Sequence, residues 1–132
     1  MNFKKRLFAT LGFVLITAAI SCKKEKAVSQ DSLANTTWAG TFIVKNDGGD
    51  PLAVKFGEDK KITLFFGNLN APAENQCKGT YTFANNKLLF SVTDFYNEKI
   101  SLAGTLTNNT ITGTWGRGNI DKGEGTFSMI KK

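Results

Sequence analysis

Few side chains in this sequence could carry out covalent chemistry. The chain has 132 residues, with no histidine and only two cysteines, Cys22 and Cys77. Without histidine, Ser-His-Asp and Cys-His catalysis and the usual histidine-containing zinc sites are excluded. Asp94, Glu98 and Asp121 supply carboxylates, but nothing in the sequence pairs two of them as a general acid and base. The sequence therefore predicts a protein with no enzymatic activity, no cofactor and no metal site.

Binding chemistry is better represented, by aromatic and charged residues near predicted loops. Phe95 and Tyr96 are adjacent, and with Trp115 they could form a platform that stacks on a sugar or a peptide. Alternatively, both rings fold inward as a plug. Arg117, between two glycines, could meet an anion or stay solvated at a turn. With Leu69 from another long loop, these are the candidate binding residues.

Two other features have simpler structural explanations. Asp47-Gly-Gly-Asp50 could offer two carboxylates to calcium, but it lacks the further oxygen ligands of known calcium loops, so a plain turn is favoured. Cys77 lies at the start of a predicted strand and faces inward. It has no cationic neighbour on its own face, which predicts a buried structural thiol and not a reactive one.

The first 22 residues have the organisation of an export signal. Three basic residues at positions 4–6 precede a 14-residue apolar run at positions 7–20, which is shorter than the ~20 residues of a membrane-spanning helix. The following Ala19-Ile20-Ser21-Cys22 resembles the lipobox of bacterial lipoproteins. The resemblance implies a signal peptide at 1–21 and acylation of Cys22. The alternative is an ordinary secretory signal with an incidental cysteine.

Residues 22–34 are predicted to be a flexible tether, because the segment is polar and charged and shows no apolar periodicity. In the lipoprotein family, a residue other than aspartate after the cysteine implies export to the outer membrane. The segment at 23–26 is mostly basic, which favours the periplasmic face, with surface display left open. The predicted folded domain spans residues 35–132.

From Asn35 on, apolar residues alternate strictly with polar ones, which is typical of antiparallel strands with one dry face. There are eight such segments and no helical pattern. The residues on the dry face, segment by segment, are Trp38, Gly40, Phe42 and Val44; Leu52, Val54 and Phe56; Ile62, Leu64 and Phe66; Cys77, Gly79, Tyr81 and Phe83; Leu88, Phe90 and Val92; Ile100, Leu102, Gly104 and Leu106; Ile111, Gly113 and Trp115; and Gly125, Phe127 and Met129.

Eight short strands in series can bury one common face by closing into an up-and-down β-barrel, which also removes both sheet edges. A two-sheet sandwich is the alternative, but it needs longer crossing connections than most of these turns. Gly-Thr followed by a large apolar residue recurs at five places, beginning at Gly40, Gly79, Gly104, Gly113 and Gly125. Glycines on the inward face would let strands coil sharply or make room for a neighbouring ring.

The segments at 35–42, with Trp38, and at 111–115, with Trp115, resemble strands of the calycin superfamily, the lipocalin and streptavidin barrels. The resemblance follows strand order from residue 35 to residue 132 and implies a lipocalin-like barrel that binds a small molecule inside. In this sequence the inward positions hold large apolar residues, Cys77 or glycine, without inward Asp, Asn, Ser or Arg. The lumen is therefore predicted to be either a small apolar site or completely filled.

The connections alternate between tight turns, at 58–59, 85–86 and 108–109, and longer loops, at 46–50, 67–76, 94–98 and 116–122. In an up-and-down barrel, alternate connections share an end. All four long loops are therefore predicted to form one rim, and both chain ends to leave from the opposite end. Loops on a rigid scaffold often carry function, so this rim is the predicted interaction surface.

The charge of the folded region excludes a nucleic-acid role, because from Asn35 on there are 11 basic and 9 acidic residues without a basic run. The predicted function is that of an envelope lipoprotein, held on the membrane through acylated Cys22, with a barrel that binds without catalysis. Two versions stay open. Either the barrel mouth takes a small apolar ligand, or a solid barrel presents its rim to another envelope protein as an inhibitor or accessory subunit.

Overall fold

Residues 33–132 are described by a computed structural model, and their alternating apolar pattern forms eight β-strands. The strands are β1 (Thr36–Val44), β2 (Gly49–Phe56), β3 (Lys61–Phe66), β4 (Gln76–Ala84), β5 (Lys87–Thr93), β6 (Lys99–Thr107), β7 (Thr110–Arg117) and β8 (Gly125–Lys131), with a short 3-10 helix, η2 (Ala73–Asn75), between β3 and β4. Within these residues no helix is long and apolar enough to span a membrane.

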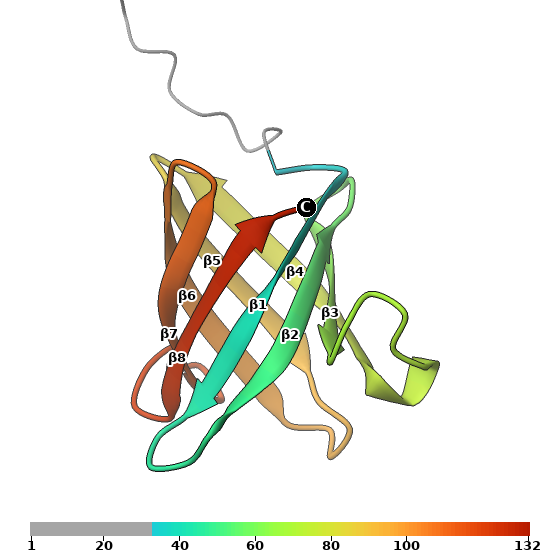
Figure 1. Cartoon of the computed structure of the whole chain (residues 1–132), viewed down its shortest axis with the longest axis vertical. Helices are drawn as coiled ribbons and strands as arrows, with labels where there is room; N and C mark the ends of the chain where they lie inside the picture. The colour runs from blue at the N-terminus through green and yellow to red at the C-terminus, as the bar shows by residue number, and fades with distance from the viewer. Residues whose placement is uncertain (1–32) are drawn as a thin grey trace, which may run out of the picture.

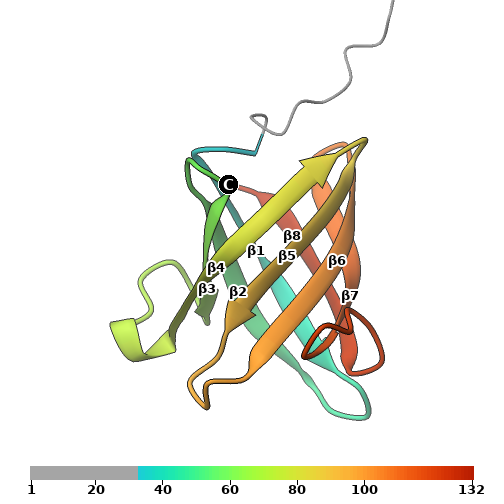
Figure 2. The same cartoon turned by 180° about the vertical axis from the view of Figure 1, so that it is seen from behind.

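The strands close into one barrel. Each strand pairs antiparallel with the next in sequence, and β8 pairs with β1 to complete the ring. Figure 1 shows β8, β1 and β2 side by side at the front, and Figure 2 shows β4, β5 and β6 on the other side. The predicted up-and-down barrel is confirmed, and the two-sheet sandwich is excluded.

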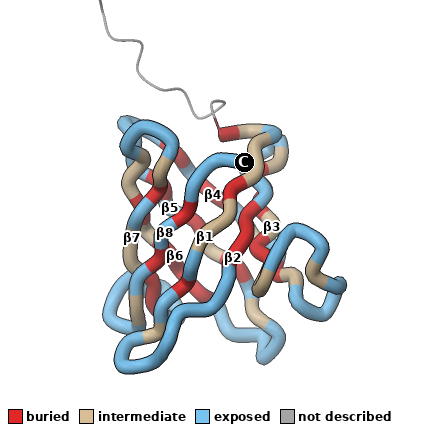
Figure 3. The backbone as a smooth tube through the Cα atoms, in the orientation of Figure 1, coloured by how far each residue is buried: buried red, intermediate tan, exposed pale blue. Residues whose placement is uncertain are grey.

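The barrel interior is the hydrophobic core. Buried and exposed positions alternate along the strands (Figure 3), and the large residues predicted to face inward are buried or packed against the buried cluster. Rings from strands that are not neighbours meet inside the barrel: Phe90 of β5 and Phe127 of β8 lie 5.8 Å apart between centroids, and Phe56 of β2 and Tyr81 of β4 lie 4.9 Å apart. The middle of the lumen is therefore filled by side chains.

Glycines occur on the inward face where neighbouring strands approach most closely. A Cβ atom on Gly79 would overlap the carbonyl oxygen of Ser91 and lie 2.9 Å from Cα of Val92. A Cβ on Gly113 would overlap the carbonyl oxygen of Ala103 in the same way. Both contacts are with the backbone of the adjacent strand, so the coiling of the barrel at these points requires residues without a side chain.

The two ends of the barrel differ. The three tight connections lie at the end where the chain enters and leaves, and there the amide of Lys132 donates to the carbonyl of Thr37 at 2.9 Å. Asn85 and Asn86 form one of these turns with φ of 51° and 61°, a conformation that asparagine tolerates. The four long connections, at 45–48, 67–75, 94–98 and 118–124, lie toward the opposite end, as predicted.

Leu33 closes the end of the barrel from which the chain ends leave. Its side chain is only 1% exposed and belongs to the core cluster, although it falls within the predicted tether. The hydroxyl of Thr36 donates to the carbonyl of Leu33, and the indole N–H of Trp38 donates to the Thr36 hydroxyl at 2.9 Å. These contacts fix the first described residues against the barrel.

Two of the long connections fold back over the outer wall. The Gln76 side chain faces outward and donates to the carbonyl of Ala71 at 2.8 Å, which places the 67–75 connection over the wall beside Phe65, the strand partner of Gln76. Outward-facing Phe65 is buried as a result. In the 118–124 connection, the Asp121 carbonyl accepts from the Thr114 hydroxyl at 2.8 Å.

Candidate functional site

The long-loop end of the barrel contains a hollow of about 260 Å³, which we name the mouth pocket. It is formed where the last inward residues of several strands meet the 94–98 and 118–124 connections. Its lining residues are Phe42, Val44, Phe66, Asp94, Phe95, Tyr96, Ile100, Trp115, Arg117 and Glu124. Phe95, Tyr96, Trp115 and Arg117 are among the candidate binding residues predicted from the sequence, and the fold brings these four into one pocket.

The base of the mouth pocket is made of stacked aromatic rings. Trp115 stacks on Phe42 with centroids 4.3 Å apart and an angle of 29° between the planes, and Phe42 meets Phe66 edge to face at 6.0 Å. Offset or edge-to-face packing of this kind stabilises aromatic pairs beyond the area they bury. The rings are mutually supported, so the base is preformed and rigid.

Trp115 also connects β7 to β1 across the intervening strand. Its indole N–H donates to the carbonyl of Ile43 at 3.0 Å, although the two residues are 72 positions apart. The indole passes Gly125 of β8, where a Cβ would overlap the Ile43 carbonyl oxygen and crowd the indole nitrogen. Because Gly125 has no side chain, the Trp115 indole can pass β8 and donate to the Ile43 carbonyl. One hydrogen bond therefore connects the base of the pocket to β1, where β1 pairs with β8.

Replacing this tryptophan tests the connection. We expect Trp115→Phe to lower the free energy of unfolding by about 1–2 kcal/mol, because a hydrogen bond is lost and the Ile43 carbonyl is left without this donor. Denaturant unfolding measures the change. Hydrogen exchange of the Trp115 indole in the parent protein is the control: exchange as fast as that of a solvent-exposed indole would contradict the geometry.

The side of the pocket is formed by the 94–98 connection, which is held by Asp94. One carboxylate oxygen of Asp94 accepts from the amides of Tyr96 at 2.9 Å and Glu98 at 2.8 Å, and the Asp94 amide donates to the Glu98 carbonyl at 2.8 Å. This closed loop presents Phe95 and Tyr96, which are 51% and 85% exposed. Phe95 leans on Phe66 at 5.7 Å. Neither ring is buried as a plug, so that alternative is excluded.

Arg117 is at the edge of the pocket, paired with Glu98. Its guanidinium donates to the Glu98 carboxylate, and both side chains are more than half exposed. The sequence left two alternatives for Arg117, an arginine that binds an anion and one that stays solvated at a turn. The structure shows a third arrangement, an exposed arginine paired with Glu98. Leu69, the remaining candidate, is 38% exposed in the 67–75 connection and does not line the mouth pocket.

Cys77 is buried, as predicted for a structural thiol. Burial raises the pKa of the Cys77 thiol, and the negative charge of Asp94 raises that pKa further. A thiol with a raised pKa is mostly protonated near neutral pH, so Cys77 is a poor nucleophile.

Asp47 lies in the turn between β1 and β2, where its amide donates to the Val44 carbonyl at 3.0 Å and its carboxylate accepts from the Gly48 amide at 2.8 Å. Asp50 belongs to β2. In the part of the chain that the structure describes, no three Cys, Asp or Glu side chains gather closely enough to hold a metal ion.

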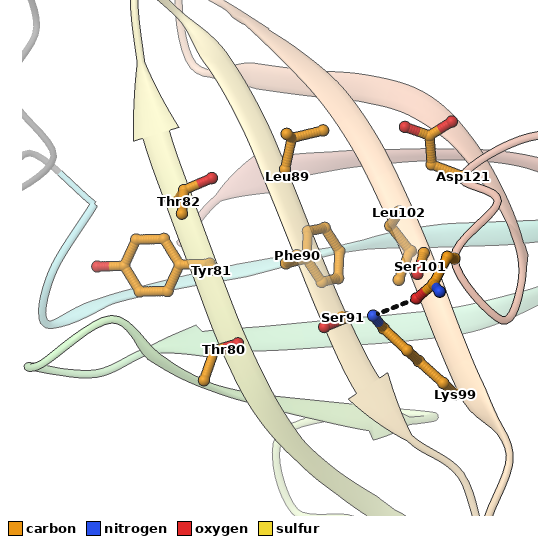
Figure 4. A pocket seen from close by; sticks show the side chains of 11 residues that line it. Thr80, Tyr81, Thr82, Leu89, Phe90, Ser91, Lys99, Ser101, Leu102 and Asp121 are labelled. Carbon is orange, nitrogen blue, oxygen red and sulfur yellow. Dashed lines mark hydrogen bonds between the residues drawn. The ribbon is translucent and has the colours of Figure 1, made fainter.

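A second hollow, also about 260 Å³, lies on the outer wall over β4, β5 and β6 (Figure 4). Its lining is more polar than that of the mouth pocket, and the 118–124 connection forms its edge. Lys99 there donates to the Asn119 side chain at 2.8 Å, and the Ser101 hydroxyl donates to the Gly118 carbonyl at 2.6 Å. These bonds fix the connection to the wall.

The mouth pocket also contains residues that were not singled out as a site from the sequence. Phe42, Val44, Phe66 and Ile100 are predicted to face inward. Val44, Phe66 and Ile100 are the inward residues nearest the rim on their strands, and Phe42 is the next inward residue on β1. Selecting the inward residues next to long loops would have found them. Glu124 carries no such signal, because its position depends on how the 118–124 connection folds back.

The chain was compared with protein-family models, with curated protein sequences and with solved structures, and none of these comparisons returned a match. The fold and the pocket together define the class: a closed eight-stranded antiparallel barrel, compatible with a calycin-like fold, with an aromatic pocket at one end.

Proposed function

We propose that this protein is an envelope lipoprotein whose barrel is a non-enzymatic binding module for a small apolar ligand. The mouth pocket carries the proposal, because it gathers five aromatic rings, from Phe42, Phe66, Phe95, Tyr96 and Trp115, around one hollow at the loop-bearing end of a rigid barrel. Apolar concave sites with a few polar groups are the usual form of a small-molecule site. The lipobox-like residues 19–22 support membrane anchoring through Cys22.

The filled lumen limits what can bind. Ring contacts such as Phe90–Phe127 occupy the middle of the barrel, so a ligand that enters from the long-loop end finds the space of the mouth pocket, about 260 Å³. This volume is below the ~300–1,000 Å³ of pockets for drug-sized ligands. The ligand, or the part of it that enters, is therefore expected to be about one ring in size.

The position of the chain ends supports an orientation for the anchored protein. Leu33 and Lys132 are at the end of the barrel opposite the mouth pocket. The 11 residues from Cys22 to Ser32 could reach at most ~40 Å when fully extended. The mouth pocket would then open away from an outer membrane to which Cys22 is anchored, on the periplasmic side that the basic segment 23–26 favours.

Native mass spectrometry of the protein purified from its own envelope tests the proposed function. We expect a discrete mass, beyond the chain and its lipid, that disappears on unfolding.

Phe95→Ala should weaken ligand binding about tenfold, since one aromatic contact is removed. Leu69→Ala is the matched control, because Leu69 is an exposed apolar residue toward the same end but outside the pocket. Equal binding by the Phe95→Ala variant would count against the proposal.

A protein partner is the second candidate, favoured by the exposure of Phe95 and Tyr96 at the rim. In that case the barrel is a solid scaffold for an inhibitor or accessory subunit. Photo-crosslinking from position 96 in intact cells would then capture a discrete protein, and the Leu69→Ala variant would weaken capture as well. A ligand-binding protein should instead show sensitivity at Phe95 and none at Leu69.

A further inference from the structure

The mouth pocket has an excess of negative charge around its aromatic lining. Three charged side chains line it, Asp94, Glu124 and Arg117, and Arg117 is already paired with Glu98. With Glu98 included, the pocket and its edge carry three carboxylates and one guanidinium. Three lysines are near these carboxylates along the chain, and none of them lines the mouth pocket: Lys45 lines a separate hollow, Lys99 donates to Asn119 on the outer wall, and Lys122, two residues before Glu124, is exposed.

The backbone is fixed at Asp94 and at Glu124, the two carboxylate residues of the pocket that are not paired with Arg117. Asp94 is held by the two amide hydrogen bonds of the 94–98 connection. The amide of Glu124 donates to the Trp115 carbonyl at 3.2 Å, and the Glu124 carbonyl accepts from the Lys45 amide at 2.7 Å. The backbone of Glu124 is thus anchored between β7 and the end of β1, and Glu124 and Trp115 both line the pocket. The Asp94 carboxylate is therefore preorganised by its hydrogen bonds, and the backbone that carries the Glu124 side chain needs little rearrangement when a ligand arrives.

The aromatic lining favours the same sign of ligand charge. The face of an aromatic ring carries negative potential and attracts ammonium groups placed within about 6 Å of its centre. Five rings line the pocket, and Tyr96 and Phe95 remain exposed at its entrance. Rings and carboxylates together would stabilise a cation and repel an anion.

We propose that the ligand of the mouth pocket is an organic cation: an ammonium group on an apolar body about one ring in size. This inference rests on the proposed ligand-binding function and adds the chemical class of the ligand. The apolar body would rest on the rings of Trp115 and Phe66, with the ammonium group at the lip near Asp94 and Glu124.

A series of probes that differ only in charge tests the inference. We would titrate 2-phenylethylammonium, 2-phenylethanol and phenylacetate into the chain from Lys23 on, which contains the complete closed barrel and its core, and follow amide shifts by NMR. We expect the ammonium probe to bind about tenfold more tightly than the alcohol, and phenylacetate to bind more weakly than either. The preference for the ammonium probe over the alcohol should decrease as salt is added, because the charged groups at the entrance of the mouth pocket are exposed to solvent.

Variants that each remove one negative charge test whether the preference for the ammonium probe comes from the mouth pocket. Glu124→Gln should weaken binding of the ammonium probe about three- to fivefold, as for one partly exposed ion pair, and leave binding of the alcohol unchanged. Asp121→Asn is the matched control: it removes the same charge from the same connection, but Asp121 lines the outer-wall hollow and not the mouth pocket. If both variants lose the same affinity for the ammonium probe, the effect comes from the overall negative charge of the protein and not from Glu124 in the pocket. That result would overturn the proposed cation site.

The outcomes separate this inference from the proposed function. If the alcohol binds as tightly as the ammonium probe, the preference for cations is wrong and the apolar pocket stands. If none of the three probes shifts the amides around the mouth pocket, both the cation site and the small-ligand function are wrong.

Discussion

Gly79→Ala is expected to lower the free energy of unfolding by about 3 kcal/mol, a loss at the upper end of what overpacking costs. The added methyl group would overlap the backbone carbonyl of Ser91 on β5, and backbone in a closed barrel cannot rotate away as a side-chain end could. β4 would have to separate from β5 or lose its sharp coil. For a domain of this size the change corresponds to a fall in Tm of roughly 12–24 °C, measurable by thermal denaturation followed by circular dichroism.

Gly48→Ala provides the matched control. Gly48 has no atom within 4 Å of the position of an added Cβ, and it is not among the residues with positive φ. Its replacement should change the stability by no more than about 0.5 kcal/mol. A Gly79→Ala variant that melts within a few degrees of the parent, like the control, would contradict the close approach of β4 and β5.

Cys22→Ser is expected to abolish lipid attachment completely. Cys22 lies outside the described residues, so this prediction rests on the lipobox-like sequence. Each buried CH2 group of an acyl chain contributes about 0.8 kcal/mol to membrane binding, so two or three chains hold a protein on the membrane almost irreversibly. A serine hydroxyl lacks the nucleophilicity of a thiolate. Cells fed an alkyne-tagged fatty acid should label the parent protein and leave the variant unlabelled.

Cys77→Ser is the control for labelling, because the Cys77 thiol is buried in the barrel and should not be acylated. The parent should also have the mass of a chain that begins at Cys22 and carries a lipid. A processed parent that begins at another residue and has no added lipid would support the ordinary secretory signal instead.

The barrel could be predicted from the sequence because a strand repeats every two residues. A residue such as Phe90 can face the core only if its neighbours Leu89 and Ser91 face outward, so each strand fixes its own orientation. Gly79 and Gly113 added a second, independent indication, since glycine on an inward position is costly unless strands approach there.

The remaining features could not be predicted, because they depend on contacts between loops and the wall. Leu33 lies in a polar stretch without periodicity, and only the structure shows it closing the barrel. Phe65 was expected to face solvent, and it is buried because the 67–75 connection lies beside it. Glu124 joins the mouth pocket for a similar reason, through the return of the 118–124 connection. No local sequence signal encodes such returns.

The seam between β1 and β8 has a consequence for the order of folding. Seven of the eight strand pairs join neighbours in sequence, whereas the eighth joins Thr36–Val44 to Gly125–Lys131. The Trp115–Ile43 bond from β7 to β1 crosses this eighth pair. The entropy lost on closing a loop increases with its length, and distant contacts slow folding. We therefore expect hairpins to form early and the ring to close last, so that residues at the seam govern how fast the barrel opens.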